Sequence, residues 1–126
     1  MYVRTIKITF KDKMSKDMFV NYTDTKADAK GIKNGTLMKL IFSNSDVIAT
    51  LVLIFPDHKT FMKDHNNLAG PIIDSFKEQG LKVDLNDGEV LGATAVSSNF
   101  LETLTKEATF YKPDWSFFKN FLNRIN

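Results

Sequence analysis

Residues 47–57 read VIATLVLIFPD, and this segment tells more about the architecture than any other. Its first part, Val47–Phe55, is apolar on both faces of an extended chain and rich in β-branched residues. Such a segment is typical of a central strand that is covered on both sides. Pro56 and Asp57 follow; proline lacks a backbone N–H, and aspartate is a common helix N-cap. We therefore expect a buried strand that leads directly into a helix.

An earlier segment resembles this one. Ile8–Asp12 reads ITFKD and Leu53–Asp57 reads LIFPD, so each is the end of a strand passing into a capped helix. Tyr2–Phe10 alternates in character, which predicts a strand with one apolar face. The helix after it is expected to be stopped by Gly31 and Asn34-Gly35. Its predicted apolar stripe consists of Met14, Met18, Tyr22, Thr25 and Ala29.

Two predicted strands form a hairpin in the middle of the chain. Thr36–Phe42 reads as extended, and the polar residues Ser43–Asp46 separate it from the segment described first. The second helix is predicted over Asp57–Gly80, with a kink or restart at Pro71, because proline disturbs the preceding helical turn.

The end of the predicted sheet is less regular. Leu81–Leu85 and Glu89–Val96 both read as extended, and Asn86-Asp87-Gly88 lies between them. An Asp-Gly pair between extended segments predicts a tight turn. We therefore expect the chain to reverse there.

The element order β-α-β-β-α-β predicts an α+β, ferredoxin-like fold: an antiparallel sheet with helices on one face. We expect this domain over residues 1–97 and a C-terminal helical extension over 98–126. The last predicted helix, Trp115–Ile125, has a broad aromatic stripe, so it should pack on the domain or on a dimer partner. The uncovered sheet face is also too apolar for water. A partner's sheet is the preferred cover, and the C-terminal helix is the alternative.

Composition excludes several classes of function. The 126 residues include 17 Lys and Arg and 15 Asp and Glu, so the formal net charge is +2, without the basic excess of a nucleic-acid binder. There is no cysteine, which excludes disulfides, thiolate catalysis and cysteine-based metal sites. Val47–Phe55 is the longest uncharged apolar stretch and is too short to span a membrane. The first residues alternate instead of forming a signal peptide. We expect a cytoplasmic protein with no cofactor, metal, nucleic-acid or membrane partner.

The two histidines are the candidate catalytic residues. His58 and His65 belong to one predicted helical stripe, which points both imidazoles toward the buried side; about 10 Å separates them, too far to share a metal ion. The alternative is that both are structural histidines with hydrogen-bond partners. The candidate ligand-binding residues are Tyr22, Phe61, Leu68 and Trp115.

The element order, the Phe55-Pro56-Asp57 helix start and the helix that follows resemble the dimeric α/β-barrel superfamily, whose best-known branch is similar to antibiotic-biosynthesis monooxygenases. The resemblance covers residues 2–97. It implies a sheet-to-sheet homodimer with an apolar pocket in each subunit. Some members oxidise aromatic substrates without metal or flavin. The haem-degrading branch fits poorly, because the tryptophan expected after the third strand is Phe55 or Pro56 here.

Two functional hypotheses follow. The first is a small dimeric protein that binds, or oxidises without a metal, a small apolar or aromatic molecule, with a histidine as base. The second is a non-catalytic interaction or regulatory module that acts through its dimer and its aromatic C-terminal helix. Whether the protein is an enzyme stays open at this point.

Overall fold

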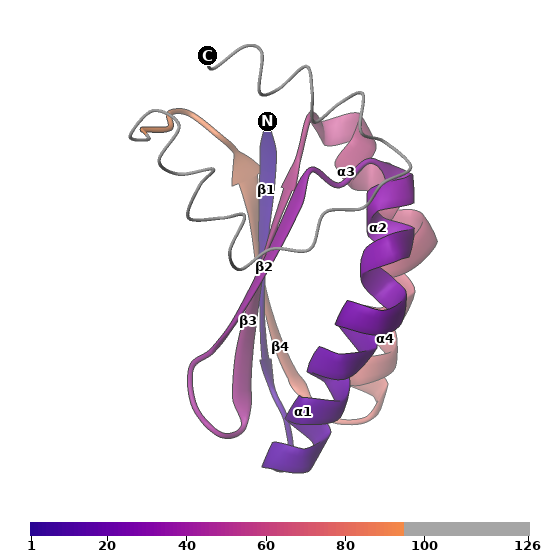
Figure 1. Cartoon of the computed structure of the whole chain (residues 1–126), viewed down its shortest axis with the longest axis vertical. Helices are drawn as coiled ribbons and strands as arrows, with labels where there is room; N and C mark the ends of the chain where they lie inside the picture. The colour runs from indigo at the N-terminus through magenta and orange to yellow at the C-terminus, as the bar shows by residue number, and fades with distance from the viewer. Residues whose placement is uncertain (95–126) are drawn as a thin grey trace. The chain divides into compact units, whose positions relative to one another are not determined.

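Four strands form one antiparallel sheet in the order β2-β3-β1-β4 in the computed structural model of the chain, which describes residues 1–94. The strands are β1 (Tyr2–Thr9), β2 (Met38–Ser43), β3 (Ile48–Phe55) and β4 (Lys82–Glu89). The apolar segment described first is β3. It is a central strand between β1 and β2 as predicted, but within residues 1–94 helices cover only one of its two faces (Figure 1). The compact unit described here is Met1–Val90.

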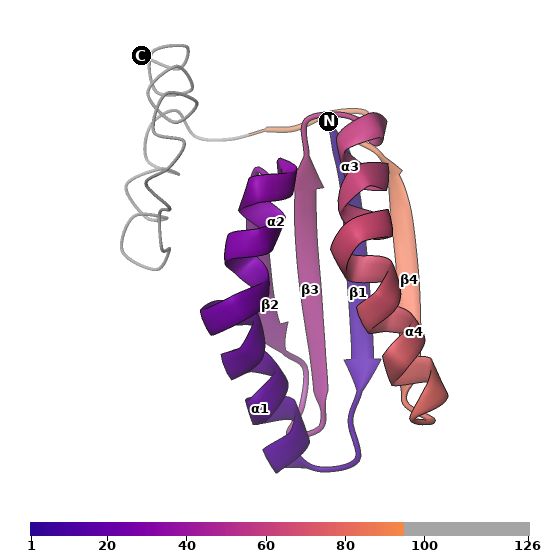
Figure 2. The same cartoon turned by 90° about the vertical axis from the view of Figure 1, so that its right-hand side faces the viewer.

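Two long helical segments cover one face of the sheet. The first consists of α1 (Lys13–Tyr22), the π-helical turn η1 (Thr23–Ala27) and α2 (Asp28–Asn34). The second consists of α3 (His58–Asp64), the π-helical turn η2 (His65–Ala69) and α4 (Gly70–Glu78). Figure 1 shows the sheet from its edge with these helices on one side only, and Figure 2 shows α3 and α4 in front of β1 and β4. The predicted ferredoxin-like α+β fold is confirmed.

Both helical segments start in the same way. The Asp12 carboxylate accepts a hydrogen bond from the Ser15 N–H, and the Asp57 carboxylate accepts one from the Thr60 N–H, each at 2.7 Å. Each satisfies an N–H that the helix itself leaves without a partner. These hydrogen bonds hold the pKa of both carboxyls below the ordinary value of 3.8. The echo between the two strand–helix junctions in the sequence is therefore a structural repeat.

The core lies between the sheet and the helices. β1 and β3 contribute its alternate residues, and the two helical segments close it from above. Its buried members are Ile6, Ile8, Phe10, Phe19, Ala49, Leu51 and Ile73. Phe10, Phe19 and Phe76 contact one another, with ring centroids 5.3 to 6.1 Å apart. The period-2 pattern of β1 therefore predicted the core-facing side of that strand correctly.

The apolar stripe predicted for the first helix is wrong. Met14 is 70% exposed and Met18 is 66% exposed, whereas Lys16 and Phe19 are buried. Farther along, every fourth residue faces the sheet: Phe19, Thr23, Ala27 and Gly31 are buried. A spacing of four suits the π-helical turn η1, which holds more residues per turn than an α-helix.

The second helical segment shows the same shift of phase. The predicted buried stripe continues after His65 with Leu68, Ile72 and Phe76. Phe76 does pack on the core, but Leu68 and Ile72 are only half-buried, whereas Ala69 packs on the core and Ile73 is buried. The predicted restart at Pro71 is a change of helix type without a break, because Gly70 keeps helical angles and its N–H bonds to the His65 carbonyl five residues back. This π-helical turn moves the following residues by about 100° around the axis.

The turn predicted at Asn86-Asp87-Gly88 is wrong. These residues lie inside β4, which is paired with β1 along its whole length. Asp87 stands opposite Arg4, and Gly88 opposite Val3. The partner strand therefore overrides a local turn preference. The remainder of the second predicted extended segment, from Val90 to Thr94, lies outside any strand.

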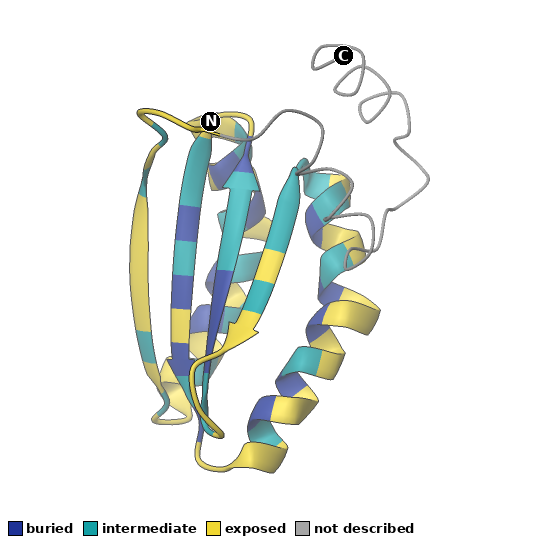
Figure 3. Cartoon of the chain, turned by 60° about the vertical axis from the view of Figure 1, so that its left-hand side comes forward, coloured by how far each residue is buried: buried dark blue, intermediate teal, exposed yellow. Residues whose placement is uncertain are grey.

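The sheet face without helices differs in polarity from one edge to the other (Figure 3). On β2, Leu40 is 48% exposed and Phe42 is 46% exposed, next to half-buried Val52 and Ile54 of β3. β4 at the opposite edge presents polar residues. Within residues 1–94 no helix is long and apolar enough to cross a bilayer. The predicted boundary at residue 97 and the extension over 98–126, including Trp115, lie outside the described residues.

Candidate functional site

Arg4 lies on the apolar face of β1 and only 4% of its side chain is exposed. Its Nε donates to Asp87 Oδ1 at 2.7 Å and its Nη2 donates to Asp87 Oδ2 at 2.8 Å. The β1–β4 register places the two residues directly opposite each other. This bidentate pairing compensates a buried charge, and it fixes the plane of the guanidinium group.

The remaining nitrogen of Arg4 holds His65. Arg4 Nη1 lies 2.9 Å from His65 Nδ1. Because arginine has hydrogen-bond donors and no acceptor, Nδ1 must be the acceptor. We therefore assign the neutral imidazole with its proton on Nε2. His65 Nδ1 has no lone pair left for a substrate proton, so this arrangement makes His65 a donor and not a base.

Aromatic rings pack around the guanidinium group. The Cζ atom of Arg4 lies 4.5 Å from the ring centroid of Phe61, a cation–π distance. Phe61 is buried and also stacks on His65, with centroids 6.1 Å apart and an interplanar angle of 22°. Tyr2 contacts the same ring at 4.6 Å. Phe61 is thus the centre of the cluster.

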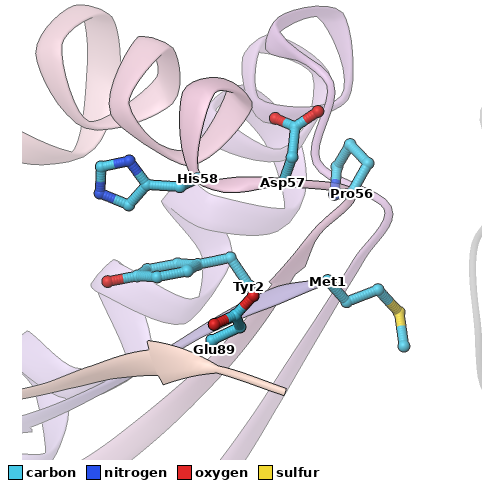
Figure 4. A pocket seen from close by; sticks show the side chains of 6 residues that line it. All are labelled: Met1, Tyr2, Pro56, Asp57, His58 and Glu89. Carbon is cyan, nitrogen blue, oxygen red and sulfur yellow. The ribbon is translucent and has the colours of Figure 1, made fainter. Parts of the chain in front are cut away.

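A hollow of about 340 Å³ opens beside this cluster (Figure 4). The ring of Tyr2 and the ring of His58 meet edge to face at 5.0 Å on one wall. Its lining residues are Met1, Tyr2, Pro56, Asp57, His58 and Glu89. The side chains of Tyr2 and His58 project to the same side in Figure 4.

A second buried carboxyl, that of Asp64, lies near Arg4. Asp64 is 3% exposed, and Asn34 Nδ2 donates to its Oδ1 at 3.4 Å. Burial raises the pKa of Asp64 above the ordinary value of 3.8, although the hydrogen bond from Asn34 and the charge of Arg4 oppose that change. Asp64 ties the second helical segment to the first, because Asn34 ends α2.

The structure brings together three of the residues proposed from the sequence: His58, Phe61 and His65. The expectation that both imidazoles face the buried side is wrong for His58, which is exposed at the helix start, whereas His65 is half-buried. Tyr22 lies at the end of α1, in the other helical segment, and is 39% exposed. Leu68 is half-buried within η2.

Sequence reasoning missed Arg4, Asp87 and Tyr2. Arg4 falls on the apolar face of the predicted strand Tyr2–Phe10, in phase with Ile6 and Ile8, and a charged residue there needs a buried partner. Asp87 is the carboxylate that supplies it, but it was assigned to a turn. A search for an acid at matching register on a neighbouring strand could have paired the two residues.

Within residues 1–94, no group of three or more His, Cys, Asp or Glu side chains is arranged to hold a metal ion. Among the polar groups of the site, those of Arg4, Asp87 and Asp57 are used in the Arg4–Asp87 pair, the Arg4–His65 bond and the α3 cap. The arrangement can therefore orient a donor and offer aromatic surface.

No protein family matches the chain by sequence, and no curated protein matches it either. Several solved structures share its fold. They include a dimeric ferredoxin-like protein from an uncultured marine organism, 13% identical, with a TM-score of 0.57 over 75% of this chain and 98% of that one. A candidate antibiotic biosynthesis monooxygenase from Deinococcus radiodurans is 15% identical, with a TM-score of 0.60 over 76% and 98%.

HapK from Hahella chejuensis is 19% identical to this chain, with a TM-score of 0.56 over 76% of this chain and 98% of that one. These similarities fit the predicted resemblance to the dimeric α/β-barrel superfamily. At these identities the shared property is the fold. The function must be argued from the site itself.

Proposed function

We propose that this protein binds a small, largely apolar or aromatic molecule in the hollow beside Tyr2 and His58. The observation that supports it most is the ring cluster around Phe61, which places two further rings on the wall of an open hollow of about 340 Å³. Small-molecule sites are typically concave, of about 300–1,000 Å³, and combine apolar walls with a few placed polar groups.

The lining of the hollow suits such a molecule. Met1, Pro56 and the Tyr2 ring offer apolar surface, and Glu89 and His58 offer polar groups at the rim. Asp57 also lines the hollow, but its carboxylate is used as the α3 cap. A flat ring lying on Tyr2 would gain a stacking contact of the kind that aromatic pairs make in proteins.

The two histidines take different roles in this proposal. His65 acts as a fixed donor, for the reason given above. His58 is exposed, and within residues 1–94 neither of its ring nitrogens has a hydrogen-bond partner. His58 is therefore the imidazole that could accept a proton from a bound molecule. Tyr22, Leu68 and Trp115 are not required.

The test uses α-methylstyrene as the probe, followed by amide chemical shifts in NMR. We expect the shifts to move for residues around Tyr2, His58 and Glu89. Tyr2→Ala should weaken binding by up to about tenfold, the value of one aromatic contact. Tyr22→Ala, an exposed tyrosine in the other helical segment, is the matched control and should bind as the natural protein does. Shifts confined to other regions, or no binding, would overturn the proposal.

We also propose that the protein is a homodimer whose subunits meet through the uncovered sheet face. Leu40 and Phe42 leave an apolar surface on β2, beside the partly buried apolar residues of β3. One neighbour with this fold is described as dimeric. An apolar patch of this kind is commonly covered by a partner.

Light scattering after size-exclusion chromatography tests the dimer. We expect twice the chain mass for the natural protein and the chain mass for Phe42→Glu. Lys82→Glu, at the polar edge of the same face, is the control and should stay dimeric. A natural protein that is monomeric at every concentration would contradict this proposal. A dimer that binds no probe would favour the interaction module.

A further inference from the structure

We propose that the ligand of this site carries a neutral carbonyl oxygen, which accepts a hydrogen bond from His65 Nε2. This inference rests on the proposed function, since it names the class of molecule that the hollow would take: an aromatic ketone or aldehyde. It depends on four features of the site, namely the tautomer of His65, the access to Nε2, the position of His65 relative to the hollow and the charge around it.

The hydrogen bond from Arg4 determines the tautomer of His65. Asp87 occupies Nε and Nη2 of Arg4, so Nη1 is the nitrogen that remains for His65 Nδ1, at 2.9 Å. The proton of the neutral ring must then reside on Nε2. Because the guanidinium is buried and held in two places, the donor direction of His65 is fixed before any ligand arrives.

The Nε2 atom is open to a ligand. Within residues 1–94, every buried side-chain nitrogen and oxygen has a hydrogen-bond partner. No such bond is made by His65 Nε2, so this atom must reach the surface. Gly70 provides the space for it: a Cβ atom at that position would lie 3.3 Å from Nε2 and from Cε1.

The hollow and His65 are neighbours along the sheet. Tyr2 and Glu89 stand opposite each other on β1 and β4, and Arg4 and Asp87 form the next core-facing pair. Two residues along a strand correspond to about 7 Å. Phe61 contacts both Tyr2 and His65, which places the donor one ring away from the hollow.

The charge around the hollow favours a neutral acceptor. Asp57 and Glu89 line it, and the side chain of Asp87 is 25% exposed nearby. The cation closest to His65, Arg4, is already paired with Asp87. An anionic oxygen at Nε2 would therefore lie beside a cation that is already paired with a carboxylate, whereas the charges of Lys59 and of the Met1 amino group act on Asp57. A carbonyl oxygen accepts the same hydrogen bond and needs no cation beside it.

The experiment compares two probes of nearly the same shape, acetophenone and α-methylstyrene, which differ in a C=O or C=CH₂ group. NMR titration of the natural protein should give an affinity about fivefold higher for acetophenone, the value of one net hydrogen bond. His65→Gln keeps an N–H donor and should preserve that ratio. His65→Leu removes the donor and should bring the ratio to about one.

The outcomes separate this inference from the proposed function. If both probes bind the natural protein equally well, the carbonyl inference is overturned while the binding site stands. If neither probe binds, the proposed function fails and this inference fails with it. Nitrogen-15 NMR of the natural protein provides a check that needs no variant: a protonated Nδ1 in His65 would also overturn the inference.

Discussion

The two β-α-β halves of this chain begin their helices alike and then bury different groups under them. Asp12 and Asp57 make the same capping hydrogen bond, at the same distance of 2.7 Å. Four residues after each cap, the first half buries Lys16 and the second half buries Phe61. The ammonium group of Lys16 donates to Ser43 Oγ and the Ser45 carbonyl, both at 2.8 Å.

The next buried position differs as well. Seven residues after the cap, the first half has Phe19 in the core and the second half has Asp64. The first half therefore uses its buried cation to hold the β2–β3 hairpin. The second half instead places an aromatic ring and a carboxyl around Arg4. The two halves share the caps and strands that form the fold. They differ at the fourth and seventh positions after the cap, and in the second half those positions contribute to the candidate site.

The largest effect should come from breaking the Arg4–Asp87 pair. Asp87→Ala leaves a buried guanidinium without its carboxylate and should lower the free energy of unfolding by about 3 kcal/mol. Urea denaturation measures this change. Asp84→Ala, in the exposed pair with Lys82 on the same strand, is the control and should change it by less than about 0.5 kcal/mol. Equal losses would show that Arg4 is not held as described.

The helical glycines of the two halves should respond in opposite ways to alanine. A Cβ at Gly70 would lie 2.6 Å from the His65 carbonyl oxygen, so Gly70→Ala should destabilise the protein by about 2 kcal/mol. A Cβ at Gly31 would meet Thr36 Oγ1 at an ordinary 3.4 Å. Gly31→Ala should therefore be neutral or stabilising, by up to about 1 kcal/mol. Thermal unfolding of both variants measures these changes in stability. Equal changes would show that the two glycines lie in equally crowded surroundings.

Asp64, which takes in the second half the place that Phe19 has in the first, should make the stability of the protein depend on pH. Since burial raises the pKa of Asp64, the folded state prefers its protonated form. The free energy of unfolding should then fall as the pH rises from below the ordinary value of 3.8 through the raised pKa. Asp64→Asn should lack this fall and be more stable than the natural protein at neutral pH. Urea titrations across this range test it, with exposed Asp74→Asn as the control for net charge; a less stable Asp64→Asn would contradict the sign.

The smallest effect should be the same in both halves. Asp12→Ala and Asp57→Ala each remove one cap, and we expect equal, modest decreases in Tm. Because both pKa values are lowered, the stability that each cap contributes is present above the ordinary value of 3.8 and is lost as the pH falls through the lowered value. Differential scanning calorimetry measures the Tm of the two variants. A large difference between their Tm values would show that the two caps are not equivalent.

Much of the fold could be predicted because its signals are local. The alternation in β1 and the doubly apolar β3 depend on which face each side chain takes, and the caps depend on a single aspartate. β4 was harder, since Asp87-Gly88 has a strong turn preference by itself. It is a strand because β1 pairs with it residue by residue, and that pairing cannot be seen within a short window.

The site was predicted only in part. His58, Phe61 and His65 were found because they recur at helical spacing. Leu68 and Ile72 were assigned to the buried stripe in place of Ala69 and Ile73, because nothing in the sequence distinguishes a π-helical turn from an α-helical one. The donor role that we assign to His65 could not be predicted from the sequence, since it depends on Arg4, which is 61 residues away.

The π-helical turn η2 has a consequence for sequence comparison. Relative to a regular α-helix, η2 adds about one residue between His65 and Ala69. An alignment with a fold neighbour that has a regular helix there therefore needs a gap of about one residue within this segment. Without it, Ile73 of the core would be matched to a surface position, and the similarity of the whole second half would be underestimated.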